Sequence, residues 1–374
     1  MLRPKKIFYF TNIFPSYRKE LWKALLSLKK IDFNIFFSPE DLNDIRTTSL
    51  DSYFTKDEIN KLNSIKNLNL MGHLFWQVGI LRKLLSSEYD SVIFLGDIKI
   101  ISNWLGIIIC KLRGKGIGLW THGIYGNENL FKKKLRLFFL KLADNIFLYE
   151  NRAKNILIYN NFPEERLHVI FNSINLNEQT KVYHKLKSES SIIHKKKFNI
   201  IFFGRLTKIK KVDIAIKAII SINQNNEKYK LKIIGDGPEK ESLKNIVISA
   251  KAEKYIFFEK AKHNEIEIGK MFFESDLLIS PGNVGLNAIH AMCYGTPVLT
   301  HNNFNNQMPE CESIKEGFNG LLHKENDIIS IQAKIELWFS KNFKTWERDK
   351  IRNKLIKKYN PQNQAKIFER VLEG

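Results

Sequence analysis

The sequence predicts an α/β protein made of two doubly wound domains, each with a parallel sheet covered by helices on both faces. Short apolar runs rich in β-branched and aromatic residues alternate along the chain with longer segments of helical spacing. Near-continuous apolar strands joined by helices are typical of buried parallel sheets. The length of 374 residues suits two domains better than one core.

The first series of alternating segments predicts an N-terminal domain over residues 1–175. It opens with a strand at 6–11 and a loop at 12–16. A helix over 17–28 follows, with apolar side chains three or four positions apart. Further strands are expected at 33–37, 91–95, 116–121 and 145–149.

The second series predicts a C-terminal domain over residues 198–358. Between the two series, the polar and basic stretch 176–197 is expected to connect the domains. The strands of the second series are expected at 198–203, 231–234, 256–258, 277–280 and 297–300. The helices between them are expected at 211–223, 238–250, 264–274 and 285–294.

Charge and composition narrow the class of protein. The net charge of +21 is spread evenly, with +10 on residues 1–175 and +11 on the rest. Such a charge favours nucleic acid, an anionic membrane or a phosphorylated small molecule as partner, or reflects a lysine-rich composition alone.

The hydrophobic content of 44% excludes a disordered or fibrous chain. Three scattered cysteines are expected to be reduced thiols. With no signal-peptide pattern and no apolar run near the ~20 residues that span a bilayer, we expect a soluble, cytoplasmic protein.

Three strand-to-helix junctions of the second series carry residues suited to a ligand, and such junctions open the crevices where these folds bind. The first holds Gly204, Arg205 and Lys210. Glycine allows close backbone approach. Arg205 and Lys210 supply a planar fork and a mobile charge beside a helix N-terminus that favours anions. This pattern predicts a diphosphate site, with a solvated basic helix start as the alternative.

The other two junctions are glycine turns. At Gly235-Asp236-Gly237-Pro238-Glu239, Asp236 is expected to cap the next helix, or else to reach a ligand. The third junction is a loop before a helix that ends at Gly295, and His290 within that helix is either a core residue or a ligand contact. Backbone N–H groups of this loop are expected to face an anion or a sugar hydroxyl, which makes donor-binding candidates of Gly282, Asn283, Val284 and Gly285.

These three pieces, in this order and spacing, resemble the C-terminal domain of GT-B glycosyltransferases, specifically the retaining glycosyltransferase family 4. The family's G-R-L-x-x-x-K element matches at 204–210, and its G-D-G-P-E element matches 235–239 outright. Its E-A-M-A-x-G-x-P-V element matches at Ala291, Met292, Gly295, Pro297 and Val298.

The resemblance is vaguer in the first half of the chain. The segment from Asn12 to Leu25, which includes Tyr17, resembles the acceptor-side loop and helix of the family. The strand end Trp120-Thr121-His122-Gly123 resembles the one where the family carries a catalytic-site histidine.

One departure concerns the third junction. The family usually has two glutamates separated by seven residues there, and this chain has Gly282 and His290 in those positions. The resemblance assigns the first glutamate to the donor sugar and the second to the nucleotide ribose. His290 is therefore expected to hydrogen-bond the ribose in place of the second carboxylate. Glu310 is a candidate substitute carboxylate.

The resemblance implies a GT-B fold, with two Rossmann-like domains facing a cleft and a C-terminal helix (359–374) returning to the first domain. It implies transfer of a sugar from a nucleotide diphosphate sugar to an acceptor hydroxyl with retention of configuration. His122, Arg205 and Lys210 are the implied catalytic residues, the two cations stabilising the leaving diphosphate. No cofactor or metal is expected, and the chain shows no strand-end Asp-x-Asp pair.

The implied acceptor is a glycan, such as a lipid-linked intermediate of a surface polysaccharide, which would place the enzyme at the inner face of the cytoplasmic membrane. The segment 130–141 mixes lysines with large apolar residues and predicts either contact with anionic lipid or a buried helix with snorkelling lysines. Two other classes stay open: a catalytically weak GT-B relative that acts as a binding or scaffold subunit, and a nucleic-acid-binding protein. No nucleic-acid-binding motif supports the last.

Overall fold

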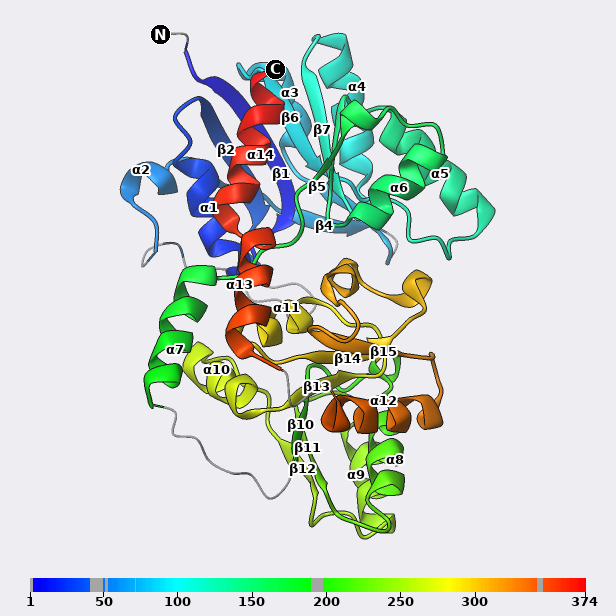
Figure 1. The fold of residues 1–374 in the computed structure, drawn as a ribbon. Coiled ribbons are helices and arrows are strands. Elements are labelled where there is room, and N and C mark those ends of the chain that lie inside the picture. The colour runs from blue at the N-terminus through cyan, green and yellow to red at the C-terminus, as the bar shows by residue number, and fades with distance from the viewer. Residues whose placement is uncertain (1–2, 41–49, 51–52, 71, 190–197, 342–345) are drawn as a thin grey trace. The chain divides into compact units, whose positions relative to one another are not determined.

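The computed structural model describes residues 3–40, 50, 53–70, 72–189, 198–341 and 346–374 (Figure 1). The chain divides into two compact units. Unit 1 comprises Met1–Asn175 and Tyr359–Gly374, and unit 2 comprises Leu176–Lys358. Each unit holds one parallel sheet flanked by helices, so the predicted doubly wound α/β fold class is confirmed.

The sheet of unit 1 has the strand order β3-β2-β1-β6-β7-β8-β9 among the described residues. Its strands are β1 (Lys5–Ile13), β2 (Ile31–Ser38), β3 (Leu62–Ser64), β6 (Ser91–Leu95), β7 (Gly116–Thr121), β8 (Asn145–Leu148) and β9 (Leu167–Val169). A separate antiparallel hairpin joins β4 (Asn67–Leu70) to β5 (Leu74–Gln77). The helices of this unit are η1 (Ser16–Arg18), α1 (Lys19–Leu26), α2 (Lys56–Ile59), α3 (Ile80–Ser86), α4 (Ile101–Leu112), α5 (Leu130–Lys141), α6 (Asn151–Tyr159), η2 (Glu164–Arg166) and α14 (Pro361–Glu373).

Alternating side chains of β1 build a core on each face of this sheet. Phe8 and Phe10 pack with buried residues of α3, α4 and α5. Ile7 and Tyr9 pack on the other face with α1 and α14. Figure 1 shows α14, in red, beside α1. The C-terminal helix therefore returns to the first domain, as the sequence predicts, and Phe368 packs 4.4 Å from Phe147 between ring centroids.

The sheet of unit 2 has the order β12-β11-β10-β13-β14-β15 among the described residues. Its strands are β10 (Phe198–Phe203), β11 (Tyr229–Ile234), β12 (Ile256–Glu259), β13 (Leu277–Ser280), β14 (Val298–His301) and β15 (Gly320–His323). Its helices are α7 (Leu176–Glu189), η3 (Lys208–Lys210), α8 (Val212–Ile222), α9 (Lys240–Ser249), α10 (Glu265–Glu274), α11 (Leu286–Cys293), η4 (Phe304–Asn306), η5 (Pro309–Ser313), α12 (Ile328–Ser340) and α13 (Arg348–Lys358).

The expected connection over 176–197 differs from the structure. Residues 176–189 form the helix α7, which belongs to unit 2 and packs against α10 and α11. Its buried residues lie three or four positions apart, and Tyr183 donates a hydrogen bond to Asp349 of α13 (2.9 Å). A narrow buried face is enough to hold a helix that is polar elsewhere. Residues 190–197 lie outside the described residues.

The described helices include none long and apolar enough to cross a membrane. The segment 130–141 forms α5, which buries Phe139 and Leu140 and exposes other large apolar side chains. Leu130 and Phe131 are each 78% exposed, so α5 matches neither a fully buried helix nor an ordinary solvated one.

Glycines at the carboxyl ends of β10, β11 and β13 let three loops of unit 2 pack backbone against backbone. A Cβ on Gly235 would lie 1.9 Å from the Gly204 carbonyl oxygen, and one on Gly237 would lie 2.4 Å from that of Leu206. Gly235 and Gly237 also have φ of 153°, which side chains disfavour. Hydrogen bonds from Leu206 N to Asp236 O (2.8 Å) and from Glu239 N to Leu206 O (3.0 Å) join the first two loops.

We expect Gly235→Ala to destabilise the protein by about 2–5 kcal/mol, because it combines a backbone clash with a strained φ. The matched control is Gly285→Ala. Gly285 has φ of −114° and no atom within 4 Å of an added Cβ. Its substitution should cost at most about 1 kcal/mol, the effect of a poorer helix N-cap. Chemical denaturation of both variants measures the difference, and equal stability would contradict the packing constraint.

Candidate functional site

In unit 2, Lys210 fastens the loop after β10 to the loop after β13. Its Nζ donates to the carbonyl oxygen and to Oδ1 of Asn283, each at 2.8 Å. Its own carbonyl accepts from Gly282 N (3.1 Å). Burial and, to a lesser extent, the nearby Arg205 lower the pKa of Lys210 to about 8, against the opposing effect of Glu310. Lys210 is therefore mainly charged at neutral pH and close to titration.

Arg205 and Glu310 are both close enough to Lys210 to affect its pKa, in opposite directions. Arg205 is exposed, whereas Glu310 in η5 is only 2% exposed. Two cations and one buried carboxylate thus meet at the carboxyl edge of the sheet. The structure brings together these three predicted residues, which lie on two different loops.

Gly282 has no room for a side chain. A Cβ there would lie 2.0 Å from the carbonyl oxygen of Ile209 and 2.7 Å from Cα of Lys210. A carboxylate at position 282 would require the η3 turn to move away. The turn that carries Lys210 therefore accounts for the glycine at this position.

The loop amides differ from the expectation that they face a ligand. Val284 N donates to Gln307 Oε1 (2.8 Å), Gly285 N donates to Asn287 Oδ1 (3.2 Å), and Gly282 N is bound to Lys210 as described. The N–H groups of these residues already have acceptors within the chain. These bonds hold the loop in place, and a ligand contact through the backbone N–H groups of Gly282, Val284 or Gly285 would have to replace them, whereas that of Asn283 N stays a prediction.

His290 and Asp236 have protein partners. Nε2 of His290 lies 2.8 Å from Oε1 of Glu265 on α10, so a ribose contact would fall to its other ring nitrogen. Asp236 does not cap α9, whose N-cap is Glu239. The carboxylate of Asp236 instead accepts a hydrogen bond from Gly237 N (2.9 Å) and forms an ion pair with Lys240 (2.8 Å). The turn ends before the helix begins, which removes Asp236 from capping distance.

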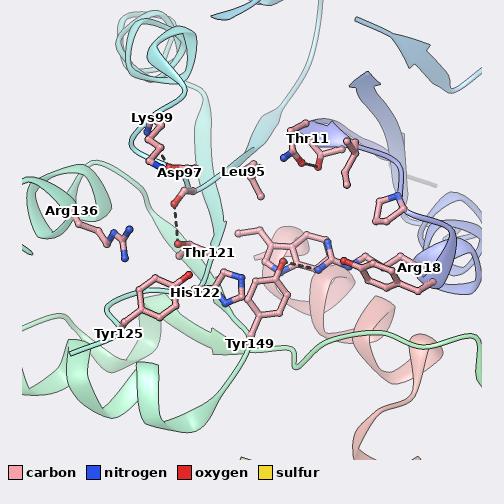
Figure 2. Close-up of a pocket in the computed structure, with 16 residues that line it drawn as sticks. Thr11, Arg18, Leu95, Asp97, Lys99, Thr121, His122, Tyr125, Arg136 and Tyr149 are labelled. Atoms are coloured by element: carbon pink, nitrogen blue, oxygen red, sulfur yellow. Dashed lines mark hydrogen bonds between the residues drawn. The ribbon is translucent and has the colours of Figure 1, made fainter. Parts of the chain in front are cut away.

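Unit 1 contains a pocket of about 430 Å³ at the carboxyl ends of β1, β6 and β7 (Figure 2). The predicted residues Asn12, Tyr17 and His122 all line it. Other lining side chains were absent from the sequence prediction because they are far apart in the chain and form no motif: Arg18, Asp97, Lys99, Tyr125, Arg136 and Tyr149. Position just beyond a strand is a signal for two of them, Asp97 after β6 and Tyr149 after β8, whereas Arg18 and Arg136 lie in helices.

His122 lies between two tyrosine rings in this pocket, as Figure 2 shows. Its ring centroid is 4.4 Å from that of Tyr149 and 5.6 Å from that of Tyr125. Burial and, to a lesser extent, the charges of Arg18 and Arg136 lower the pKa of His122 to about 4. Its Nδ1 is buried and has no hydrogen-bond partner among the described residues. The imidazole is therefore neutral at pH 7 and can accept a proton or a hydrogen bond.

Arg18 places a buried cation at the floor of the same pocket. Its guanidinium donates to the Tyr149 hydroxyl (2.8 Å) and to Asn172 Oδ1 (3.1 Å), and lies 4.8 Å from the ring centroid of Trp120. Arg136, on the opposite wall, pairs with Glu128 (2.9 Å). Polar hydroxyls, a neutral imidazole and positive charge together suit a ligand rich in oxygen atoms.

The described part of the chain holds no group of three or more His, Cys, Asp or Glu residues placed to bind a metal ion. Its free cysteines Cys110, Cys293 and Cys311 are all buried.

The chain is similar in sequence to two proteins that are named as uncharacterized. An uncharacterized 41.2 kDa protein in the cps region of Klebsiella pneumoniae is 27% identical over 190 residues, which are 50% of this chain and 49% of that protein. An uncharacterized glycosyltransferase of Methanocaldococcus jannaschii is 25% identical over 334 residues, 82% of this chain and 80% of the relative.

Solved structures share the fold over nearly the whole length. The Anabaena protein HepE in complex with UDP superimposes with a TM-score of 0.69 at 15% identity, covering 99% of both chains. The lipopolysaccharide outer core galactosyltransferase WaaB, in its apo form, gives 0.69 at 17% identity, covering 98% of this chain and 99% of WaaB. A glycosyltransferase from Rickettsia africae gives 0.70 at 14% identity, covering 100% of both chains.

A family model described as glycosyl transferases group 1 matches residues 184–371. This match includes the three glycine loops of unit 2 together with Arg205 and Lys210, the features that the geometry singled out. Because the model covers half of the chain, the protein belongs to the glycosyl transferases group 1 family.

Proposed function

We propose that this protein transfers a sugar from a nucleotide diphosphate sugar to a glycan acceptor, with retention of anomeric configuration. The observation that carries the proposal is the joint placement of Arg205 and Lys210 on loops locked by glycine packing in unit 2. Two neighbouring cations on one loop, of which Lys210 is held in place by Asn283, suit an anion with two phosphate groups. The HepE relative, whose structure contains UDP, supports a uridine nucleotide as the first donor to test.

In this proposal, unit 2 stabilises the leaving group. As the glycosidic bond breaks, positive charge develops on the sugar and negative charge on the departing diphosphate. Arg205 offers a planar fork to the phosphate oxygens, and Lys210 adds a charge that a bound phosphate would strengthen by raising its pKa. Lys210 acts without reorganisation, because Asn283 already positions it. The scheme assigns no step to a metal ion.

The pocket of unit 1 would hold the acceptor sugar. His122 is neutral there, and its buried Nδ1 needs a hydrogen-bond partner. A sugar hydroxyl could supply that bond and be oriented by it. Asn12 and Tyr17, which line the same pocket, would contact other hydroxyls. The acceptor class, a glycan of a surface polysaccharide, draws support from the WaaB and cps-region relatives.

UDP should stabilise the protein against thermal unfolding, by about 2.7 kcal/mol at 100 times its dissociation constant.

Arg205→Ala should lower the transfer rate about 100-fold, since the substitution removes a hydrogen-bond donor from the negative charge that develops on the leaving diphosphate. The matched control is Lys208→Ala, an exposed cation of the same turn, which should stay within about threefold of the unmodified rate. UDP binding with no transfer to any acceptor would favour the scaffold alternative, and no binding of any nucleotide would reject the donor proposal.

His122→Ala should abolish most transfer and leave UDP affinity within about twofold, because the residue belongs to unit 1, whereas the proposed UDP loops belong to unit 2. His168→Ala is its control. His168 also lies in unit 1, and its pKa is also lowered to about 4, mainly by burial. It does not line the pocket. Equal losses in both variants would indicate a folding defect rather than a role in transfer.

We also propose that α5 contacts an anionic membrane. The helix exposes Leu130, Phe131 and Phe138. Three consecutive lysines lie beside them, Lys132, Lys133 and Lys134, and this composition is typical of an interfacial helix. Reversal of these lysines to glutamate should release the protein from vesicles containing anionic lipid, since each cation near such a surface contributes about 1 kcal/mol. Flotation of vesicles measures this release. Reversal of Lys228, Lys230 and Lys260 changes the net charge equally and should release far less. Equal release by both triple variants would reject a specific contact by α5.

A further inference from the structure

The hairpin β4–β5 directs its polar face at a second pocket of unit 1. Asn67 pairs with Gln77 and Asn69 with Phe75, and residues paired in this way lie on one face of the hairpin. All four of these residues line a pocket of about 230 Å³. The other face carries Leu68 and Leu70, which are 39% and 38% exposed.

This orientation is the reverse of the usual one. An antiparallel ribbon ordinarily turns its apolar face toward the protein and its polar face toward water. Here the apolar face remains partly in water while amide side chains line a cavity. Burial of apolar surface does not explain this arrangement. Asn67 Nδ2 donates to Asn12 O (2.8 Å) and Gln77 Nε2 to Thr11 O (3.0 Å), which holds the polar face against the end of β1. A polar ligand in the pocket would suit the amide groups that remain.

Gln77 supplies a second observation. It is 1% exposed, and its Nε2 donates to the carbonyl oxygen of Thr11 (3.0 Å) and to Asn67 Oδ1 (3.2 Å). Its Oε1 is buried and has no hydrogen-bond partner among the described residues. A buried acceptor left without a donor costs about 1–3 kcal/mol. A ligand hydroxyl in this pocket would provide the missing donor.

The lining indicates the chemical class of the ligand. Glu40 and Asp97 add carboxylates to the amides, and the described residues of the lining include no lysine or arginine. Anions are therefore disfavoured, and hydroxyl donors are favoured. Phe75 contributes an aromatic wall for the C–H face of a ring. These features together fit a neutral sugar, and the volume is about half that of the pocket at His122.

The two pockets adjoin, because Asn12, Ile13 and Asp97 line both. We propose that the smaller pocket is a second acceptor subsite, which binds a neutral sugar residue linked to the one that His122 contacts. This inference rests on the proposed function, because it names the substrate class of the same site. The acceptor is then at least a disaccharide, and a single sugar fills the site only in part.

The test compares affinities of neutral disaccharides of glucose, galactose, mannose and N-acetylglucosamine with those of the matching methyl glycosides, by titration calorimetry and saturation-transfer NMR. At least one disaccharide should bind about tenfold more tightly than either of its methyl glycosides, the gain of one or two hydrogen bonds. Asn69→Ala and Phe75→Ala should each reduce this ratio toward one and leave the methyl glycoside affinity unchanged. Leu68→Ala, on the opposite face of the hairpin, should keep the ratio.

A ratio near one in the unmodified protein, a ratio that survives both lining variants, or no binding by any disaccharide would each overturn the subsite. UDP titration of the same variants separates this inference from the proposed function. Normal UDP binding without a disaccharide preference rejects the subsite alone. A disaccharide preference that depends on Asn69 and Phe75, in a protein that binds no nucleotide, rejects the donor proposal and keeps the subsite.

Discussion

Close backbone contact among the loops that follow β10, β11 and β13 is the constraint on which the candidate donor site depends. Gly235 lies against Gly204, and Gly282 lies against the turn that carries Lys210. Each contact excludes a β-carbon, so the glycines of these motifs serve packing before they serve any ligand. The loops can then hold Arg205 and Lys210 near each other despite their repulsion. The motif is thus one interlocked object rather than three independent binding elements.

More of the fold than of the candidate site could be predicted from the sequence. Strands such as β6 and β10 are continuous apolar runs, and the predicted bounds coincide with the structure. The helix α7 was assigned to a connection because its buried face is narrow and the rest of it is polar. Arg205 and Lys210 are close in sequence and form a motif. The residues around His122 are not close in sequence and form no motif. Arg18 and Tyr149, for example, come together only because of the order of the strands in the sheet. The β4–β5 hairpin alternates polar and apolar residues over 67–70, but four residues are too short a run for this pattern to predict a strand.

The overall charge of +21 explains little of the site. Most of the cations lie on the surface, where exposed charges contribute little to any specific contact. The charges that define the candidate acceptor and donor sites are few and partly or fully buried, such as Arg18 beside Tyr149 and Lys210 between two loops. His122 stays neutral because of the same burial and the neighbouring arginines. The evenly distributed positive charge therefore affects the solubility of the protein and its encounter with anionic surfaces. Burial, by contrast, determines which of its groups are reactive.

The return of α14 to unit 1 has a consequence for how the protein is made. A ribosome produces residues 1–175 first, then all of unit 2, and only afterwards residues 361–373. Until then the face of the first sheet that Phe368 and Leu372 cover stays open, with Trp120 and Phe147 exposed to solvent or to chaperones. Unit 2 can therefore complete its core before unit 1 does. Nascent chains that stop within unit 2 would present this aromatic surface for aggregation.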